Sequence, residues 1–219
     1  ALSVYEIPIK KGILFAPHPA FVKNEKGEYI NHALAPEVID ELHNPMDLPQ
    51  KGTRELTAED FVYSIKRMAN PRIIAPVYGT MVNYLPGLKD FAVQVRAEDK
   101  RLRADLKPSD RDLPFLDLRK FELKGVSAPD KYTLRLEVKG KYPQFPNWLA
   151  MTFFAPVPWE AEAFYAQKGM AKNNLSLNYW PVGTGPYMLV ESIENRKHVM
   201  ERNLNFRKTE LYPLSLIHI

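Results

Sequence analysis

Residues 54–71 read RELTAEDFVYSIKRMANP, and this stretch carries the strongest signal for the fold. Thr57 is a good N-cap residue, and Asp60 stands three residues later. Together they match a capping box with Asp in place of the usual Glu. Leu56 and Phe61 occupy the two positions of a hydrophobic staple across the same helix start. The stretch therefore predicts a helix that begins at Thr57.

The apolar positions of this stretch continue at helical spacing. They are Phe61, Val62, Ile65 and Met68. Asn70 and Pro71 end the run, because a proline disfavours helical backbone at the residue before it. We predict a helix to about Ala69 with these four side chains facing inward.

The chain before this helix is mostly irregular. Residues Tyr5–Phe15 alternate well enough for a strand, and Pro8 favours an edge position. Five prolines lie between Ala16 and Gly52, so we expect a long irregular segment with one short helix around Pro36–Leu42.

Helices and strands are interspersed in the sequence after the helix predicted at residues 57–69. Two helical regions are expected at Pro76–Tyr84 and Pro86–Leu106. Phe121–Val126 and the alternating residues 132–139 predict a hairpin that turns at Ala128–Lys131, with one buried face.

Two short helices and a second hairpin follow. The helices are expected at Phe145–Met151 and at Pro158–Gln167, and the hairpin strands at Tyr187–Glu191 and Lys197–Arg202. This mixed order favours an α/β or α+β architecture built on a mixed sheet.

Composition narrows the classes of protein. The 219 residues include no cysteine, which excludes disulfide scaffolds, thiolate metal sites and cysteine nucleophiles. No apolar run approaches the ~20 residues that cross a bilayer. The net charge is +4, and both signs alternate in the most charged stretch, Arg96–Arg111. A solvated face is the better interpretation of that stretch than a nucleic-acid interface.

No catalytic or metal-binding motif stands out. The five histidines show no paired ligand spacing, so we expect surface histidines, no metal and no cofactor: His18, His32, His43, His198 and His218. No serine lies in a GxSxG motif. Glu160 and Glu162 are expected on the surface of a helix, and Asp60 serves the cap.

Residues 180–187, WPVGTGPY, contain two glycines around a threonine, as phosphate-binding loops often do. Such a loop follows a strand and opens a helix, whereas here a strand is expected after the loop. Pro186 also lacks the N–H donor that an anion would use. We interpret Gly183 and Gly185 as part of a strand entry, where glycine permits positive φ or close backbone approach.

Four segments together resemble the family 5 extracellular solute-binding proteins, the peptide-, dipeptide- and nickel-binding receptors of ABC importers. The segments are RELTAEDFVYSIKRMANP (54–71), GVSAPDKYTLRLEVKGKYPQFPNWLAMTFFAPVPWEA (125–161), PVGTGPYML (181–189) and ERNLNFRKTELYP (201–213). Their order and spacing match the family from about Tyr5 to Pro213. In the last segment Leu204 replaces the family's usual proline and Phe206 its usual tyrosine.

The resemblance implies a periplasmic-binding-protein-like type II fold, of which residues 1–213 form part of the first lobe, a mixed sheet with helices. It implies a non-catalytic receptor that closes two lobes on a peptide or other small solute and works with ABC permease subunits. The location would be periplasmic or extracytoplasmic, membrane-anchored if the protein is a lipoprotein, and the complete receptor a monomer. No nucleic acid is expected as a partner.

The resemblance also suggests ligand contacts soon after the helix of residues 57–69. Tyr78 and Tyr84 are the candidates, and ordinary core packing is the competing interpretation. A hydrolase of peptides or glycosides, with its catalytic residues beyond Pro213, remains the alternative function.

The two ends of the chain suggest a gene fragment. The first residues lack the initiating Met and the features of a signal peptide. Residues 214–219, LSLIHI, resemble translated sequencing adapter, so we expect a non-native tail after Pro213.

Overall fold

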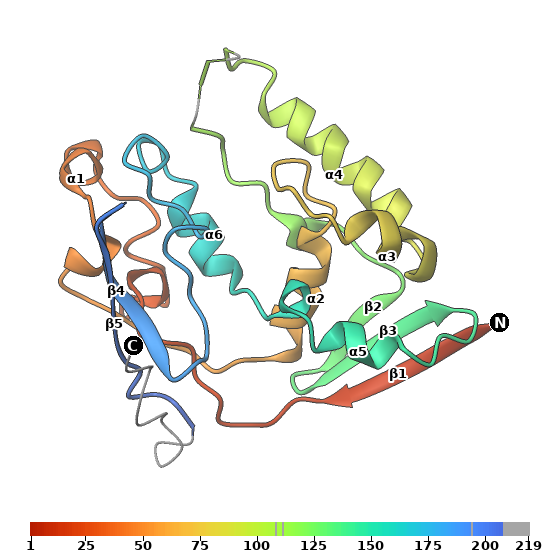
Figure 1. The fold of residues 1–219 in the computed structure, drawn as a ribbon. Helices are drawn as coiled ribbons and strands as arrows, with labels where there is room; N and C mark the ends of the chain where they lie inside the picture. Colours follow the sequence, from red (N-terminus) through yellow and green to blue (C-terminus); the bar gives the residue numbers. More distant parts are fainter. Residues whose placement is uncertain (108, 111, 194, 208–219) are drawn as a thin grey trace.

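The computed structural model describes residues 1–107, 109–110, 112–193 and 195–207. The predicted tail at residues 214–219, and with it His218, lies outside these residues. Figure 1 shows the arrangement of helices and strands. The helices are α1 (Pro36–Glu41), α2 (Ala58–Arg67), α3 (Tyr78–Tyr84), α4 (Leu88–Leu102), α5 (Phe145–Leu149) and α6 (Trp159–Tyr165). The strands are β1 (Leu2–Pro8), β2 (Val126–Asp130), β3 (Thr133–Lys139), β4 (Tyr187–Ile193) and β5 (Lys197–Arg202).

Helix α2 forms as predicted. Thr57 is its N-cap, the capping box is present, and the Asp60 carboxylate accepts the Thr57 N–H at 2.8 Å. Val62, Ile65 and Met68 are buried, while Phe61 is half-buried and packs against two clusters of apolar side chains. The helix ends at Arg67, two residues before the predicted end.

Strands β1, β2 and β3 form an antiparallel sheet in the order β1-β3-β2. Leu134, Leu136 and Val138 point into the core and are buried, which confirms the predicted alternation. Strand β1 is an edge strand, as Pro8 suggested, but it spans Leu2–Pro8 rather than Tyr5–Phe15. The chain leaves the sheet after Pro8 and bends at Gly12, whose φ is +76°.

The first hairpin begins later than predicted. Residues 121–125 lie outside the sheet, and the turn falls at 130–133, where the Tyr132 N–H donates to Asp130 Oδ1 at 2.8 Å. Packing explains the shift, because a Cβ on Gly125 would lie 2.7 Å from the Pro86 carbonyl oxygen. This close approach holds the segment against the start of α4 and delays β2 to Val126.

The remaining predicted elements are present. Residues 16–52 are largely irregular and contain α1, and α3 to α6 lie in the predicted helical regions. Strands β4 and β5 form the second hairpin, and all strand pairings among the described residues are antiparallel. The described residues of the charged stretch, 96–107 and 109–110, are mostly exposed, as predicted, although Asp99 is buried.

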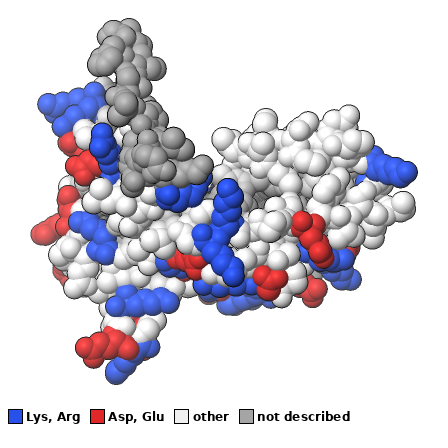
Figure 2. All heavy atoms as spheres, turned by 90° about the horizontal axis from the view of Figure 1, so that it is seen from below, with Lys and Arg blue, Asp and Glu red and all other residues white. Residues whose placement is uncertain are grey.

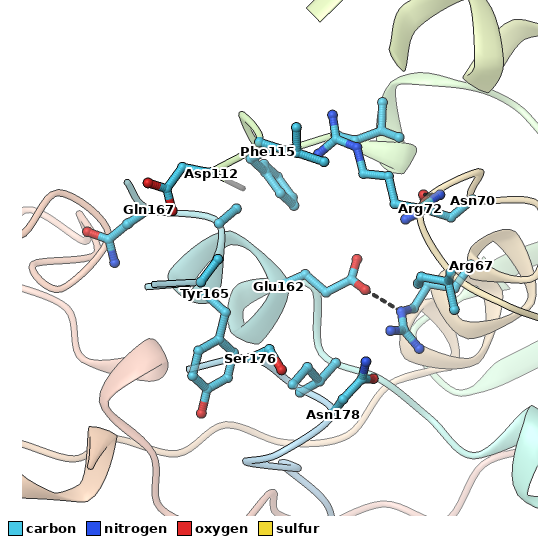
Figure 3. Close-up of a pocket in the computed structure, with 16 residues that line it drawn as sticks. Arg67, Asn70, Arg72, Asp112, Phe115, Glu162, Tyr165, Gln167, Ser176 and Asn178 are labelled. Carbon is cyan, nitrogen blue, oxygen red and sulfur yellow. Dashed lines mark hydrogen bonds and ion pairs between the residues drawn. The ribbon is translucent and has the colours of Figure 1, made fainter. Parts of the chain in front are cut away.

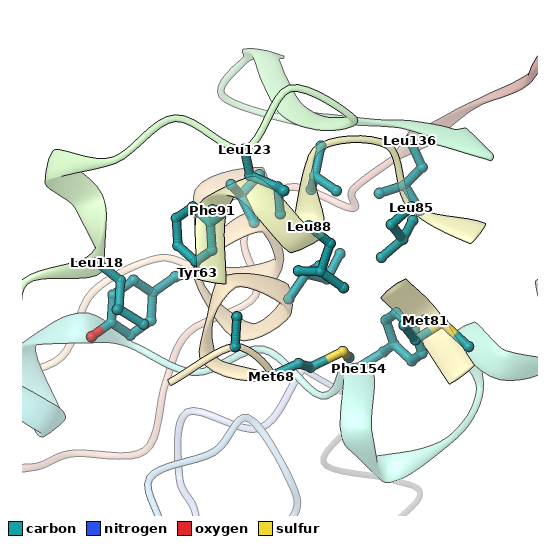
Figure 4. Close-up of a cluster of buried hydrophobic side chains, with 14 of the residues drawn as sticks. Tyr63, Met68, Met81, Leu85, Leu88, Phe91, Leu118, Leu123, Leu136 and Phe154 are labelled. Carbon is teal, nitrogen blue, oxygen red and sulfur yellow. The ribbon is translucent and has the colours of Figure 1, made fainter. Parts of the chain in front are cut away.

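Two hydrophobic cores organise the molecule. The first joins α2, α3, α4 and the three-stranded sheet (Figure 4) and includes Met81, Leu88 and Phe91. The second joins α6, α1 and the irregular segments around them and includes Phe15 and Phe164. In Figure 1 the helices and strands around the first core lie on the right and those around the second on the left. Helices α2 and α6 lie between them and are joined by the hydrogen bond from Tyr63 to Glu162.

The surface carries both signs of charge. On the face shown in Figure 2, lysine and arginine side chains lie among aspartates and glutamates, and much of the remaining face is uncharged.

Candidate ligand-binding site

Arg54 links α2 and α6 where the two cores meet. Its guanidinium contacts both carboxylate oxygens of Asp60, at 2.6 and 2.9 Å, and both of Glu160, at 2.6 and 2.7 Å. The two carboxylates are 3% and 2% exposed. Burial raises the pKa of Glu160, but the hydrogen bonds and charge of Arg54 outweigh burial and hold that pKa below its usual value. Glu160 therefore stays ionised, and Arg54 with its two carboxylate partners forms a clamp between α2 and α6.

A second ion pair involves Glu162, two residues after Glu160 on α6. The Tyr63 hydroxyl donates to Glu162 Oε2 at 2.5 Å, and Arg67 Nε donates to Glu162 Oε1. Glu160 and Glu162 were predicted on a surface helix, and that prediction is wrong for both. Their partners on α2 and at Arg54 lie about a hundred residues earlier in the sequence, so local spacing gave no sign of the pairing.

An open pocket of about 230 Å³ lies beside this second pair (Figure 3). In Figure 3, Asp112, Phe115 and Arg72 line one side, Ser176 and Asn178 the other, and Glu162 reaches across to Arg67. Arg72 donates to Asp99 and to the Pro114 carbonyl, both at 2.6 Å. Its Nη2 is buried with no protein partner among the described residues. The pocket is polar enough to hold ordered water or a small polar ligand.

A larger groove, here called the α2 groove, runs along α2. It has a volume of about 750 Å³ and is lined by residues of four segments: Lys23 and Tyr29, residues 54–66, residues 119–122, and Trp159 with Glu160. The Arg119 guanidinium stacks on the Trp159 ring at 3.4 Å, and the Tyr29 ring meets the Trp159 ring edge-on at 5.4 Å. Aromatic rings and both signs of charge in one groove suit a ligand with apolar and charged parts.

His18 contradicts the prediction of surface histidines. It is 4% exposed and packs against Phe164 and Phe21. The Ala20 N–H donates to its Nδ1 at 3.1 Å, so the proton lies on Nε2, which donates to the Tyr165 hydroxyl at 2.9 Å. Burial, helped by the neighbouring His32, lowers the pKa of His18 to about 3.

The other described histidines differ in exposure. His32 is half-buried and stacks on Tyr29 at 4.5 Å, whereas His43 and His198 are exposed. The described residues contain no group of three His, Cys, Asp or Glu placed to hold a metal ion. None of the described helices has the length and apolar character needed to span a membrane.

Comparison with known proteins identifies the family. Residues 51–217 match the group described as "Bacterial extracellular solute-binding proteins, family 5 Middle". The chain belongs to this family.

Two relatives show the extent of the match. The peptide transport periplasmic protein SapA of Haemophilus influenzae is 30% identical over 161 residues, which cover 72% of this chain and 26% of SapA. The periplasmic murein peptide-binding protein MppA of Escherichia coli K12 is 26% identical over 167 residues, 75% of this chain and 26% of MppA. The chain thus spans about a quarter of the length of the relatives it matches.

The fold agrees with the family. The pheromone receptor PrgZ, solved to show its mode of peptide binding, superposes with a TM-score of 0.50. The match covers 93% of this chain and 28% of PrgZ at 18% sequence identity, so the likeness concerns the fold alone. The chain is part of a periplasmic-binding-protein-like fold of type II.

In this solute-binding protein the loop at residues 181–186 leads into β4, as the strand-entry interpretation requires. The expected reason for its glycines is wrong, because neither Gly183 nor Gly185 has a positive φ and no atom crowds their Cβ positions. Their carbonyls are used instead. The Gly183 oxygen accepts the Ala16 N–H at 2.8 Å, and the Gly185 oxygen accepts the Asn203 amide at 2.9 Å.

Tyr78 and Tyr84 both lie on α3 and are half-buried against the first core. Tyr78 lines a shallow pocket of about 300 Å³ near Asn70 and Arg96. The Tyr84 ring stacks on that of Tyr142 at 4.5 Å, and the Tyr142 hydroxyl accepts a hydrogen bond from Trp148. The structure does not bring the two tyrosines into one pocket, and their contact with ligand stays a prediction.

Sequence reasoning missed the α2 groove. Its residues come from separate segments, and Trp159 and Arg119 show no spacing that would single them out. The one available signal was Lys66, a lysine next to the apolar residue Ile65 and four positions after Val62 on the predicted helix.

Proposed function

We propose that this chain is part of the extracytoplasmic substrate-binding component of an ABC importer that takes up oligopeptides or dipeptides. Residues 1–213 would belong to lobe I of a two-lobe receptor that closes on its ligand and performs no catalysis. The partners would be a peptide and the permease subunits, and the complete receptor would be a monomer. The periplasm, or the outer face of the membrane for a lipoprotein, would be its location.

The observation that supports this most is the family match over residues 51–217 together with relatives named for peptide transport and peptide binding. The ion pairs of Arg54 with Asp60 and Glu160 are consistent with a receptor that performs no catalysis. Asp60 and Glu160 are fully engaged by one arginine, an arrangement that holds two parts of a scaffold together and leaves no carboxylate of that clamp free for acid–base chemistry.

Tyr78 and Tyr84 are proposed as ligand contacts. Replacing each by alanine in the full-length protein should weaken peptide binding. An alanine at Tyr179, which is exposed and lies far along the chain from α3, serves as the matched control.

The direct test incubates the full-length protein with a mixture of short peptides, separates the protein from free peptide and identifies what it retains by mass spectrometry. We expect retained peptides of unchanged mass. Shortened products would favour a hydrolase, and the absence of any retained peptide would contradict peptide binding.

A further inference from the structure

Lys66 is a buried lysine whose ammonium makes no direct ion pair within the described part of the chain. It lies on α2 at the wall of the α2 groove and is only 9% exposed. Its ammonium forms no ion pair or hydrogen bond with the described residues, and Nζ lies 5.9 Å from the centroid of the Phe91 ring. The ammonium therefore has no direct protein anion among the described residues and can meet a bound anion from the groove.

None of the carboxylates near Lys66 is an anion in direct contact with its ammonium among the described residues. Asp60 and Glu160 are already held by Arg54. Glu59, Asp117 and Glu122 attract the Lys66 ammonium from a longer distance, yet burial outweighs them and the pKa of Lys66 lies below its usual value. An additional carboxylate in direct contact is what the site lacks.

The charges of the side chains that line the α2 groove suit a ligand with a carboxylate. Five cationic and four anionic side chains line it, and Lys23 and Lys120, like Lys66, form no ion pair with the described residues. The lining therefore carries a net charge of +1, which the carboxylate of one ligand would balance.

Apolar surface lies in the same groove. The half-buried Trp159 ring is held between Arg119 and the edge of Tyr29, which fixes its orientation. Phe121 adds a second ring to the lining. A side chain next to a bound carboxylate would find an aromatic wall there.

We propose that the α2 groove binds the C-terminal residue of a peptide, with the terminal carboxylate on Lys66 and the last side chain against Trp159. The proposal rests on the proposed function and names a contact region in addition to Tyr78 and Tyr84. Lysine suits the carboxylate as a point charge whose buried stem is already ordered.

The test compares a tripeptide that ends in phenylalanine, as free acid and as C-terminal amide, by calorimetry on the full-length protein. The free acid should bind roughly tenfold or more tightly than the amide, as expected for one charged hydrogen bond. Lys66→Met should remove that difference, whereas Lys89→Met, at an exposed position of α4, should keep it.

Nuclear magnetic resonance of methyl-labelled lysines gives a second readout that does not depend on a variant. Adding the free acid should raise the pKa of Lys66, and adding the amide should not. Equal affinity for acid and amide in the unmodified protein would overturn the groove assignment and leave peptide binding intact. Failure of both peptides to bind would contradict the proposed function and the groove together.

Discussion

At the scale of single residues, Arg54 has the most consequential contacts. Its guanidinium forms ion pairs with two buried carboxylates and lies over the Phe15 and Phe21 rings, with centroids 5.1 and 5.6 Å away. Through it α2 in the first core is tied to α6 in the second. Removing one partner of a buried ion pair leaves the charge of the other partner buried and uncompensated.

Arg54→Met should therefore destabilise the protein by about 3 kcal/mol in urea unfolding. Methionine keeps much of the side-chain volume of arginine. The loss of stability therefore measures the cost of leaving the Asp60 and Glu160 carboxylates without their cation. Lys51→Met, at a nearby exposed position, is the control and should change stability by less than about 0.5 kcal/mol. A neutral effect of Arg54→Met would show that the clamp contributes nothing to stability.

His18 predicts a pH dependence. Its folded-state pKa of about 3 lies below the ordinary 6.5, so the unfolded chain binds a proton that the folded chain does not between these values. Stability should fall as the pH drops from about 6.5 toward 3, by roughly 1.4 kcal/mol per pH unit from this residue.

His18→Gln should flatten that slope, and His43→Gln, at an exposed histidine, should leave it unchanged. Chemical denaturation at pH 6.5, 5.5 and 4.5 measures it. Parallel curves for the unmodified protein and His18→Gln would mean that His18 is not held neutral.

At the scale of elements, the start of α2 is fixed by side-chain caps. Thr57→Ala removes the N-cap half of the capping box while Asp60 remains on Arg54, so the expected cost is ~1 kcal/mol. Thr57→Ser should retain most of the stability. Thermal unfolding of both variants checks this, and an Ala variant as stable as the Ser variant would contradict the capping role.

The loop at residues 181–186 should bind no anion. Its glycine carbonyls accept hydrogen bonds from Ala16 and Asn203, so the loop presents acceptors rather than a nest of N–H donors. Calorimetry with inorganic phosphate should give no heat assignable to the loop. Saturable phosphate binding that Gly183→Val abolishes would contradict this.

Sequence patterns within a single segment were enough to predict α2 and β3. The cap, staple and spacing of α2 and the alternation of β3 lie within single segments, and both elements form as predicted. The start of β2 was misplaced because the close contact of Gly125 with Pro86 involves residues 39 positions apart, which no window around the hairpin contains.

The candidate site was less accessible to sequence reasoning for the same reason. The sequence predicts Glu160 on the surface because its partner, Arg54, is 106 positions away. His18 is also predicted on the surface, because its partner, Tyr165, lies 147 positions further on. Burial of a charged or titratable side chain depends on such distant partners, and the sequence alone does not pair them.

At the scale of the whole molecule, the chain spans about a quarter of the length of its relatives, and its two cores meet through the clamp of α2 and α6. In a receptor of two lobes, ligand is enclosed when the lobes close. One lobe alone would lack the hydrogen bonds and the exclusion of water that the other supplies.

Peptide affinity of residues 1–213, compared with that of the full-length protein, tests the central claim most directly. Two lost contributions of ~1.4 kcal/mol each already weaken binding a hundredfold. We therefore predict at least a hundredfold weaker binding by residues 1–213, together with a tendency to aggregate through uncovered sheet edges and apolar surface. A monodisperse, monomeric 1–213 protein with the full affinity would place the whole binding site within these residues and contradict binding by closure of two lobes.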